Sequence, residues 1–414
     1  MSEIATRAGD QPQVLMRRLT LTHSVLYGLG VTIGAGIYVL VGIAAGRSGM
    51  HAPIAFALAA LIMGLSAASF AELGTRMPVS ASEAAYVEKA FNRRWFSLLM
   101  GLLVIITAVI SAATISAGSA GYIGVFLPWE PTWIIAGVVV TMGLIACLAT
   151  VHSISFAGVM TLIEVAGLVL IVGAGLFQGS ALVTRLPEMW PGWALSGWTG
   201  IASTALIAVF AFIGFEHLVN IAEEMKSPSW TLPRALFLTL GLTAVIYGLV
   251  VWVAVTAVSP AELAASPAPL ALVFERLTGL PLITLSAIAI VATLNGVIVH
   301  MIMIARVVYG LAQQGNLPAV LGNVNTTTGT PLVATALGAA LILFFALAVP
   351  LEGLAQLTSQ GTLVIFAIVN LALIRIKLGE AEPPPGVFVC AIWVPIAGLS
   401  ASVLLLLLDI ALFS

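Results

Sequence analysis

The stretch Gly28-Leu-Gly-Val-Thr-Ile-Gly-Ala-Gly-Ile-Tyr-Val-Leu-Val-Gly42 decides the fold of this chain, and it lies inside the first long apolar segment. Glycine weakens a helix, yet backbone groups within lipid need partners inside the protein. Thr32 to Gly36 therefore predict a helix interrupted at membrane depth, in a protein-lined cavity of the kind in which transporters hold substrate. Small residues also allow close helix packing, so the stretch alone leaves a binding site and a packing interface equally open.

The composition of the whole chain indicates an all-α polytopic membrane protein. Of its 414 residues, 61% are hydrophobic and 8% are charged, whereas a soluble domain carries about 25% charged residues. The two cysteines, Cys147 and Cys390, predict neither a disulfide framework nor a metal site.

A membrane-spanning helix needs roughly 20 apolar residues, and eleven such spans are expected near residues 22–45, 52–74, 96–123, 132–149, 155–178, 199–225, 232–258, 282–311, 332–350, 354–375 and 387–412.

Basic residues predict how these spans are oriented. If the polar tail of residues 1–18 is cytoplasmic, alternation leaves only Arg47, Arg185 and Arg276 outside. This asymmetry follows the positive-inside rule and places the C-terminus outside. The tail lacks a signal-peptide layout, and the chain is expected in a bacterial or archaeal plasma membrane, the inner membrane where there are two.

A second interruption is expected in the sixth span. There the sequence Phe210-Ala-Phe-Ile-Gly-Phe-Glu216 brings a glycine and a carboxylate together near the middle of the span. The first and sixth spans are five apart and run in opposite directions. Paired interruptions at corresponding places in two halves indicate the binding site of an inverted-repeat transporter.

Several ordered motifs resemble signatures of the amino acid–polyamine–organocation superfamily. They are Gly30–Val39, Ala71–Leu73 with Pro78 and Ser82–Tyr86, Phe212–Glu216 with Ala222–Pro228 and Leu232–Arg234, and Ala305–Tyr309 with Gly315–Pro318. The resemblance implies the leucine-transporter type fold of five plus five helices in inverted repeats, within residues 19–180 and 195–378. A peripheral eleventh helix then occupies residues 386–414, whereas relatives often have twelve helices.

The two breaks are expected to bind an amino acid without ionic side chains. Opened turns expose N–H groups at a helix start and C=O groups at a helix end, which attract a carboxylate and an ammonium group. The resemblance implies this backbone recognition, with Phe210 capping the substrate, although Phe210 and Phe212 also suit ordinary core packing. The candidate substrate-binding residues are Thr32, Ile33, Gly34, Ala35 and Gly36, then Phe210, Ala211, Phe212, Ile213, Gly214 and Glu216, and Thr107 and Ala108 for the side-chain pocket.

Two carboxyl residues near mid-membrane are candidates for proton coupling, and a third polar residue there is a candidate for the site or for a structural role. Glu164 lies where many family members carry a lysine, and burial disfavours a charged carboxyl; it is expected to carry a coupling proton or to join two helices as a structural carboxyl. Glu216 is the second candidate for the proton or for a cationic substrate, or else hydrogen-bonds neighbouring helices. Asn295 either faces the site or ties two helices together.

The chain is therefore expected to be a secondary active transporter of amino acids that works by alternating access, as a proton symporter or an exchanger. A cationic amino acid or polyamine antiporter is the alternative. A membrane-embedded enzyme or a channel is disfavoured because catalytic motifs, phosphate loops and filter motifs are missing from the sequence. No cofactor, metal or nucleic acid is expected; the amino acid, the proton and membrane lipid are the expected partners, and an accessory subunit stays open.

Overall fold

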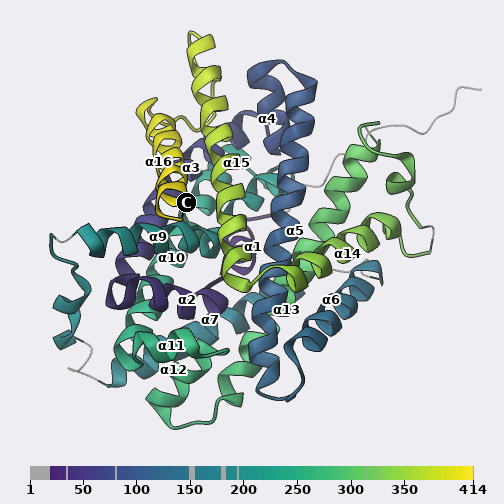
Figure 1. Ribbon diagram of the computed structural model, residues 1–414. Helices are drawn as coiled ribbons and strands as arrows, with labels where there is room; N and C mark the ends of the chain where they lie inside the picture. The colour runs from purple at the N-terminus through teal and green to yellow at the C-terminus, as the bar shows by residue number, and fades with distance from the viewer. Residues whose placement is uncertain are drawn as a thin grey trace, which may run out of the picture.

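The computed structural model forms a bundle of helices (Figure 1). It describes residues 19–33, 36–79, 82–148, 154–178, 183–193, 195–313, 315–325 and 327–413. The predicted cytoplasmic tail, residues 1–18, lies outside this range. Within the range the only β-type pairing is an isolated bridge between Leu19 and Met225, so the prediction of an all-α protein is confirmed.

The helices run in chain order through two interrupted crossings and nine continuous ones, which together form the eleven crossings predicted. The interrupted crossings are α1 (Leu21–Ile33) with α2 (Gly36–Ser48), and α9 (Leu195–Phe212) with the 3₁₀ helix η3 (Phe215–Glu224). The continuous crossings of the described chain are α3 (Ala52–Arg76), α5 (Arg94–Gly124), α6 (Pro131–Leu148), α7 (Ile154–Phe177), α10 (Pro228–Ala257), α13 (Ile283–Gln313), α14 (Leu332–Ala348), α15 (Leu351–Gly379) and α16 (Trp393–Phe413).

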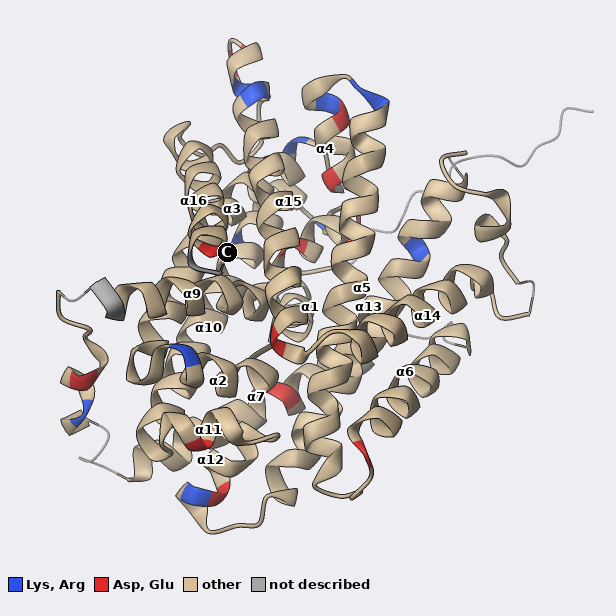
Figure 2. Ribbon diagram, viewed as in Figure 1, with Lys and Arg blue, Asp and Glu red and all other residues tan. Residues whose placement is uncertain are grey.

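Length and composition support a membrane location for this bundle. Nine described stretches are long and apolar enough to cross a membrane, one of them running through α2 and α3, and α1 and α14 are shorter apolar helices. Figure 2 shows most charged residues at helix ends and in connecting segments, with few inside the bundle. The short elements η1 (Gly49–His51), α4 (Ser82–Phe91), η2 (Leu186–Met189) and η4 (Ala319–Gly322) lie in the connections.

Two short helices between α10 and α13 form a packed cover over the first crossing. They are α11 (Pro260–Ala265) and α12 (Pro269–Thr278). Leu263 and Leu270 are fully buried, and a Cβ on Gly42 of α2 would lie 2.7 Å from the Leu263 carbonyl oxygen. Hydrogen bonds from the Ser259 hydroxyl and from Arg276 lower the pKa of Glu262, which completes the capping box at the start of α11.

A buried carboxylate ties α3 to α15 and to the segment before α16. Glu72 of α3 is fully buried, and its oxygens accept from Arg76 Nη2 at 2.7 Å, from Lys377 Nζ at 2.8 Å and from the Cys390 N–H at 2.9 Å. We call these four residues the Glu72 junction. Arg76 also pairs with Glu380 Oε2 at 2.5 Å, so removal of the Glu72 charge deprives Lys377 of the anion that it contacts and leaves Arg76 with Glu380.

We expect Glu72→Gln to destabilise the protein by about 3 kcal/mol, the order of loss for a broken buried ion pair. Thermal unfolding in detergent should show a clearly lower Tm. Glu352→Gln is the matched control, because the Glu352 side chain is 53% exposed and exposed pairs contribute little. Equal Tm values for the two variants would contradict this role of the Glu72 junction.

Candidate functional site

The predicted first break falls between α1 and α2. Helix α1 ends at Ile33 and α2 begins at Gly36, and Gly34 and Ala35 between them lie outside the described residues. The Tyr247 hydroxyl of α10 donates to the Thr32 carbonyl at 2.9 Å. A carbonyl at the end of α1 is thereby satisfied by a side chain, as backbone within a membrane requires.

The second break separates α9 from η3. Helix α9 ends at Phe212, and Gly214 has φ +125°, a conformation that only glycine adopts easily. The Gly214 N–H donates to Glu216 Oε2 at 2.8 Å, and the Gly214 carbonyl accepts from the His217 N–H at 3.0 Å. The Glu216 carboxylate therefore caps the start of η3 from within its first turn.

The two breaks touch each other backbone to backbone. A Cβ on Gly36 would lie 2.6 Å from the Ala211 Cα, and one on Gly214 would lie 2.7 Å from the Val31 carbonyl oxygen and 2.9 Å from the Thr32 nitrogen. Real Cβ contacts are longer than this, so a side chain at either glycine forces backbone to move. The glycines predicted to break the helices also allow the breaks to meet.

A small cavity lies beside this contact, between the breaks and the helices α5 and α13. Its volume is about 20 Å³, which admits a water molecule but not an amino acid, so binding a substrate requires the walls to separate. Its lining includes four of the predicted residues, Thr32, Gly36, Phe210 and Ile213, together with Val31, Ser111, Ile115, Gly296 and His300.

Other residues predicted for the site lie beside this cavity rather than on its wall. Phe212 packs its ring against Phe56 and Tyr247, at centroid distances of 6.3 and 5.2 Å. Ile33 and Ala211 are fully buried.

On α5 the cavity is lined by Ser111 and Ile115, whereas the sequence predicts the side-chain pocket at Thr107 and Ala108. Thr107 faces α15, where a Cβ on Gly361 would lie 2.4 Å from its Oγ1. Positions 107, 111 and 115 share one helical face, and of these three only Ser111 and Ile115 line the cavity.

Glu164 of α7 is fully buried and meets Asn295 of α13. Its Oε1 accepts from Asn295 Nδ2 at 2.9 Å, while its Oε2 has no hydrogen-bond partner among the described residues. No ion pair to Glu164 is formed within the described chain. The Tyr38 hydroxyl of α2 donates to the Glu164 carbonyl at 2.8 Å, which brings α7 close to the first break.

Glu216 is not among the residues that line the cavity. Besides its bond to the Gly214 N–H, its Oε1 lies 3.8 Å from His217 Nε2, and the residue is 8% exposed. The His217 ring lies 6.4 Å from that of His300, centroid to centroid. Glu216 therefore acts within η3 in this conformation, next to the cavity but not on its wall.

An ion pair closes one end of the first crossing against α9 and α15. Arg47 of α2 reaches Glu352 at 2.6 Å, the Ser203 hydroxyl at 2.9 Å and Gln356 Oε1 at 3.5 Å. Gln356 Nε2 in turn donates to Asp409 of α16 at 2.9 Å. We call the contacts of Arg47 with Glu352, Ser203 and Gln356 the Arg47 closure.

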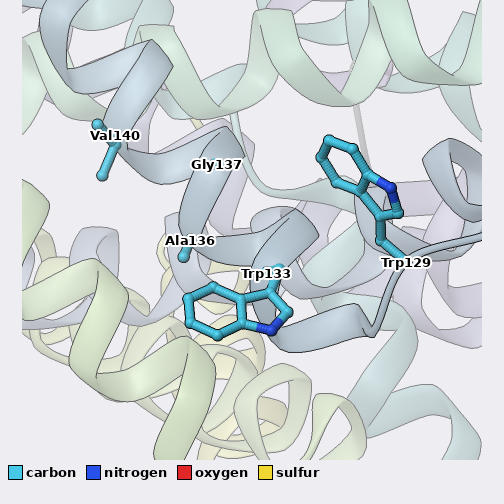
Figure 3. Close-up of a pocket in the computed structure, with 5 residues that line it drawn as sticks. All are labelled: Trp129, Trp133, Ala136, Gly137 and Val140. Atoms are coloured by element: carbon cyan, nitrogen blue, oxygen red, sulfur yellow. The ribbon is translucent and has the colours of Figure 1, made fainter. Parts of the chain in front are cut away.

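A larger hollow lies on the surface of α6, away from both breaks. It has a volume of about 650 Å³ and is lined by Trp129, Trp133, Ala136, Gly137 and Val140. Figure 3 shows the two indole rings beside the short side chains of this face. Lipid contact requires an apolar outer face, and this hollow fits that role. The candidate functional site is therefore the other cavity, which lies between the breaks and has polar residues in its lining.

Comparison with known proteins agrees with this geometry. A family model described as amino acid permease matches residues 19–413. The chain is 28% identical to the vacuolar cationic amino acid transporter 2 of Arabidopsis thaliana over 90% of its own length and 61% of that protein. It is 27% identical to the branched-chain amino acid permease BcaP of Bacillus subtilis, over 92% of its own length and 85% of that protein. These names describe carriers rather than enzymes.

Proposed function

Since the chain belongs to the amino acid permease family, we propose that it is a secondary active transporter that carries amino acids by alternating access. The observation that carries this proposal is the contact between the two helix breaks, with a cavity lined by residues of both. Interrupted helices that meet at membrane depth provide a binding site in transporters.

The substrate's α-amino and carboxylate groups bind at the breaks. N–H groups at a helix start favour a carboxylate, and C=O groups at a helix end favour an ammonium group. Thr32 lines the cavity and its buried Oγ1 has no hydrogen-bond partner among the described residues. An unsatisfied buried hydroxyl is costly, and a substrate carboxylate supplies the missing acceptor.

The size of the cavity and the Arg47 closure support alternating access. An amino acid enters only when the walls separate, and the Arg47 closure holds α2, α9 and α15 together at one end. In the proposed topology the N-terminus is cytoplasmic, so this end faces outward. In this proposal residues 19–180 and 195–378 are the two inverted repeats, and α16, which covers Trp393–Phe413 of the segment 386–414, is the peripheral helix.

Glu164 carries the coupling proton in this proposal. It is buried, has one unmatched oxygen, and is joined through Asn295 to α13 and through Tyr38 to the first crossing. Charging this carboxyl without a cation is unfavourable, so its protonation is linked to movements that let water reach it. Exchange of one amino acid for another uses the same site without this step.

A counterflow experiment tests the proposal. Purified protein in liposomes preloaded with unlabelled amino acids should take up the same labelled amino acid transiently against its gradient. A panel of neutral, cationic and acidic amino acids and polyamines identifies the substrates. Absence of counterflow for the entire panel, with correctly folded protein, would refute amino acid transport; flux that is independent of internal substrate would indicate a channel.

A further inference from the structure

We propose that Ser111 and His300 recognise the substrate's side chain, and that they select a small neutral amino acid carrying a hydroxyl group, of which threonine is the best fit. This inference rests on the proposed function, because it assigns a substrate class to the same cavity. Both residues were absent from the candidates predicted from sequence, and both line the cavity, Ser111 from α5 and His300 from α13.

Hydrogen bonds fix the state of the His300 ring. Its Nδ1 lies 2.9 Å from the Gly296 carbonyl oxygen, and its Nε2 lies 3.0 Å from Ser111 Oγ. A carbonyl oxygen only accepts, so Nδ1 carries the hydrogen and Nε2 accepts from the Ser111 hydroxyl. The cavity wall thus holds a neutral imidazole acceptor and a hydroxyl that can donate or accept.

The lining carries no full charge for a cationic side chain. None of the described residues that line the cavity is Asp, Glu, Lys or Arg. Glu216, the nearest candidate for such a partner, is bonded to the Gly214 N–H and faces His217. A guanidinium or ammonium group would lose its hydration here without gaining a counter-ion. The cavity therefore favours a neutral side chain.

The size and polarity of the cavity lining further restrict which neutral side chains fit. The cavity lining also includes the apolar side chains of Val31, Ile115, Phe210 and Ile213, so a branched side chain of modest size meets apolar surface there. Threonine presents a methyl group to that surface and a hydroxyl group to the Ser111–His300 pair. A hydroxyl both donates and accepts, so it joins the pair without leaving either member unsatisfied.

Threonine and valine provide a matched test, because they differ only by a hydroxyl in place of a methyl group. Ser111 and His300 satisfy each other when no hydroxyl joins them, so valine leaves the pair intact and is not strongly rejected. We expect transport efficiency for threonine to exceed that for valine by about tenfold, the size of one net hydrogen bond.

The decisive variant is the double substitution Ser111→Ala with His300→Leu, and Ser116→Ala is a control on the same helix. Ser116 is also fully buried, but its hydroxyl donates to the Ala112 carbonyl within α5. In competition counterflow, the double variant offers no partner to a substrate hydroxyl, so the threonine-to-valine ratio should fall close to one with valine transport retained, whereas Ser116→Ala keeps the ratio. Ser111→Ala alone leaves His300 Nε2 as an acceptor for the threonine hydroxyl, so this variant should still prefer threonine.

The outcomes separate this inference from the proposed function. Counterflow of amino acids with valine equal to threonine in the wild type, or with a ratio unchanged in the double variant Ser111→Ala with His300→Leu, would refute the inference and leave transport standing. Preference for arginine or lysine would also refute it. Failure of every amino acid to produce counterflow would refute the proposed function together with the inference.

Discussion

Glu164→Gln protein is expected to lose proton-driven accumulation of substrate while it keeps amino acid counterflow. Glutamine keeps the size of the side chain and its hydrogen bond with Asn295 but cannot release a proton. With a pH difference of one unit, a proton symporter can accumulate substrate about tenfold. With the Glu164→Gln variant, the substrate concentration inside the liposomes should stay close to the concentration outside. Uptake of labelled substrate into liposomes with an imposed pH gradient measures this.

Glu188→Gln is the matched control for this experiment. Glu188 lies in η2, is exposed and pairs only with Arg185 among the contacts described, so the same chemical change there should leave accumulation unaltered. Undiminished gradient-driven accumulation by Glu164→Gln would show that the proton travels elsewhere. Glu164 would then be a structural carboxyl that joins α7 to α13.

Gly214→Ala is expected to reduce counterflow by about a hundredfold or more. The added Cβ meets the backbone of Val31 and Thr32 within 3 Å, and φ at this position is +125°. Backbone strain of this kind costs on the order of 1–3 kcal/mol, and displacement of the first break removes the geometry that binds substrate. The measurement compares initial counterflow rates of Gly214→Ala and the wild type. Each rate is divided by the amount of folded protein, which the size-exclusion profile gives.

Gly248→Ala controls for the general effect of losing a glycine in a membrane helix. Gly248 lies in α10, and a Cβ there would have open space around it. Its counterflow rate should stay within about twofold of wild type, as for a substitution away from packed features. Similar rates for Gly214→Ala and the wild type would show that the contact between the breaks is not needed for transport.

The breaks themselves could be predicted from sequence because they depend on local chemistry. Gly34, Gly36 and Gly214 lie within apolar segments, where glycine weakens a helix. The two segments are five spans apart, so the predicted alternation makes them run in opposite directions. The all-α architecture follows in the same way from apolar segments of membrane-spanning length. Sequence left packing and binding equally open at Gly36, and the structure shows that this glycine approaches Ala211 closely.

The cavity wall could not be predicted to the same detail, because it depends on how distant helices are rotated and shifted against each other. The pair Ser111 and His300 joins residues 189 positions apart, and Glu164 and Asn295 are 131 apart. Sequence placed Asn295 either at the site or between helices, and its bond to Glu164 now joins α13 to α7. Thr107 shares a face of α5 with Ser111 and Ile115, but only Ser111 and Ile115 line the cavity.

Substrate protection of a cysteine at the first break tests the central claim, that an amino acid binds between the two breaks. The chain has two cysteines, Cys147 and Cys390, so replacing both by serine and introducing Val31→Cys leaves one reactive thiol on the cavity wall. With counterflow intact, saturating threonine should slow alkylation of this thiol severalfold, and a non-transported amino acid should not. Alkylation at the same rate with and without saturating substrate would contradict a binding site between the breaks.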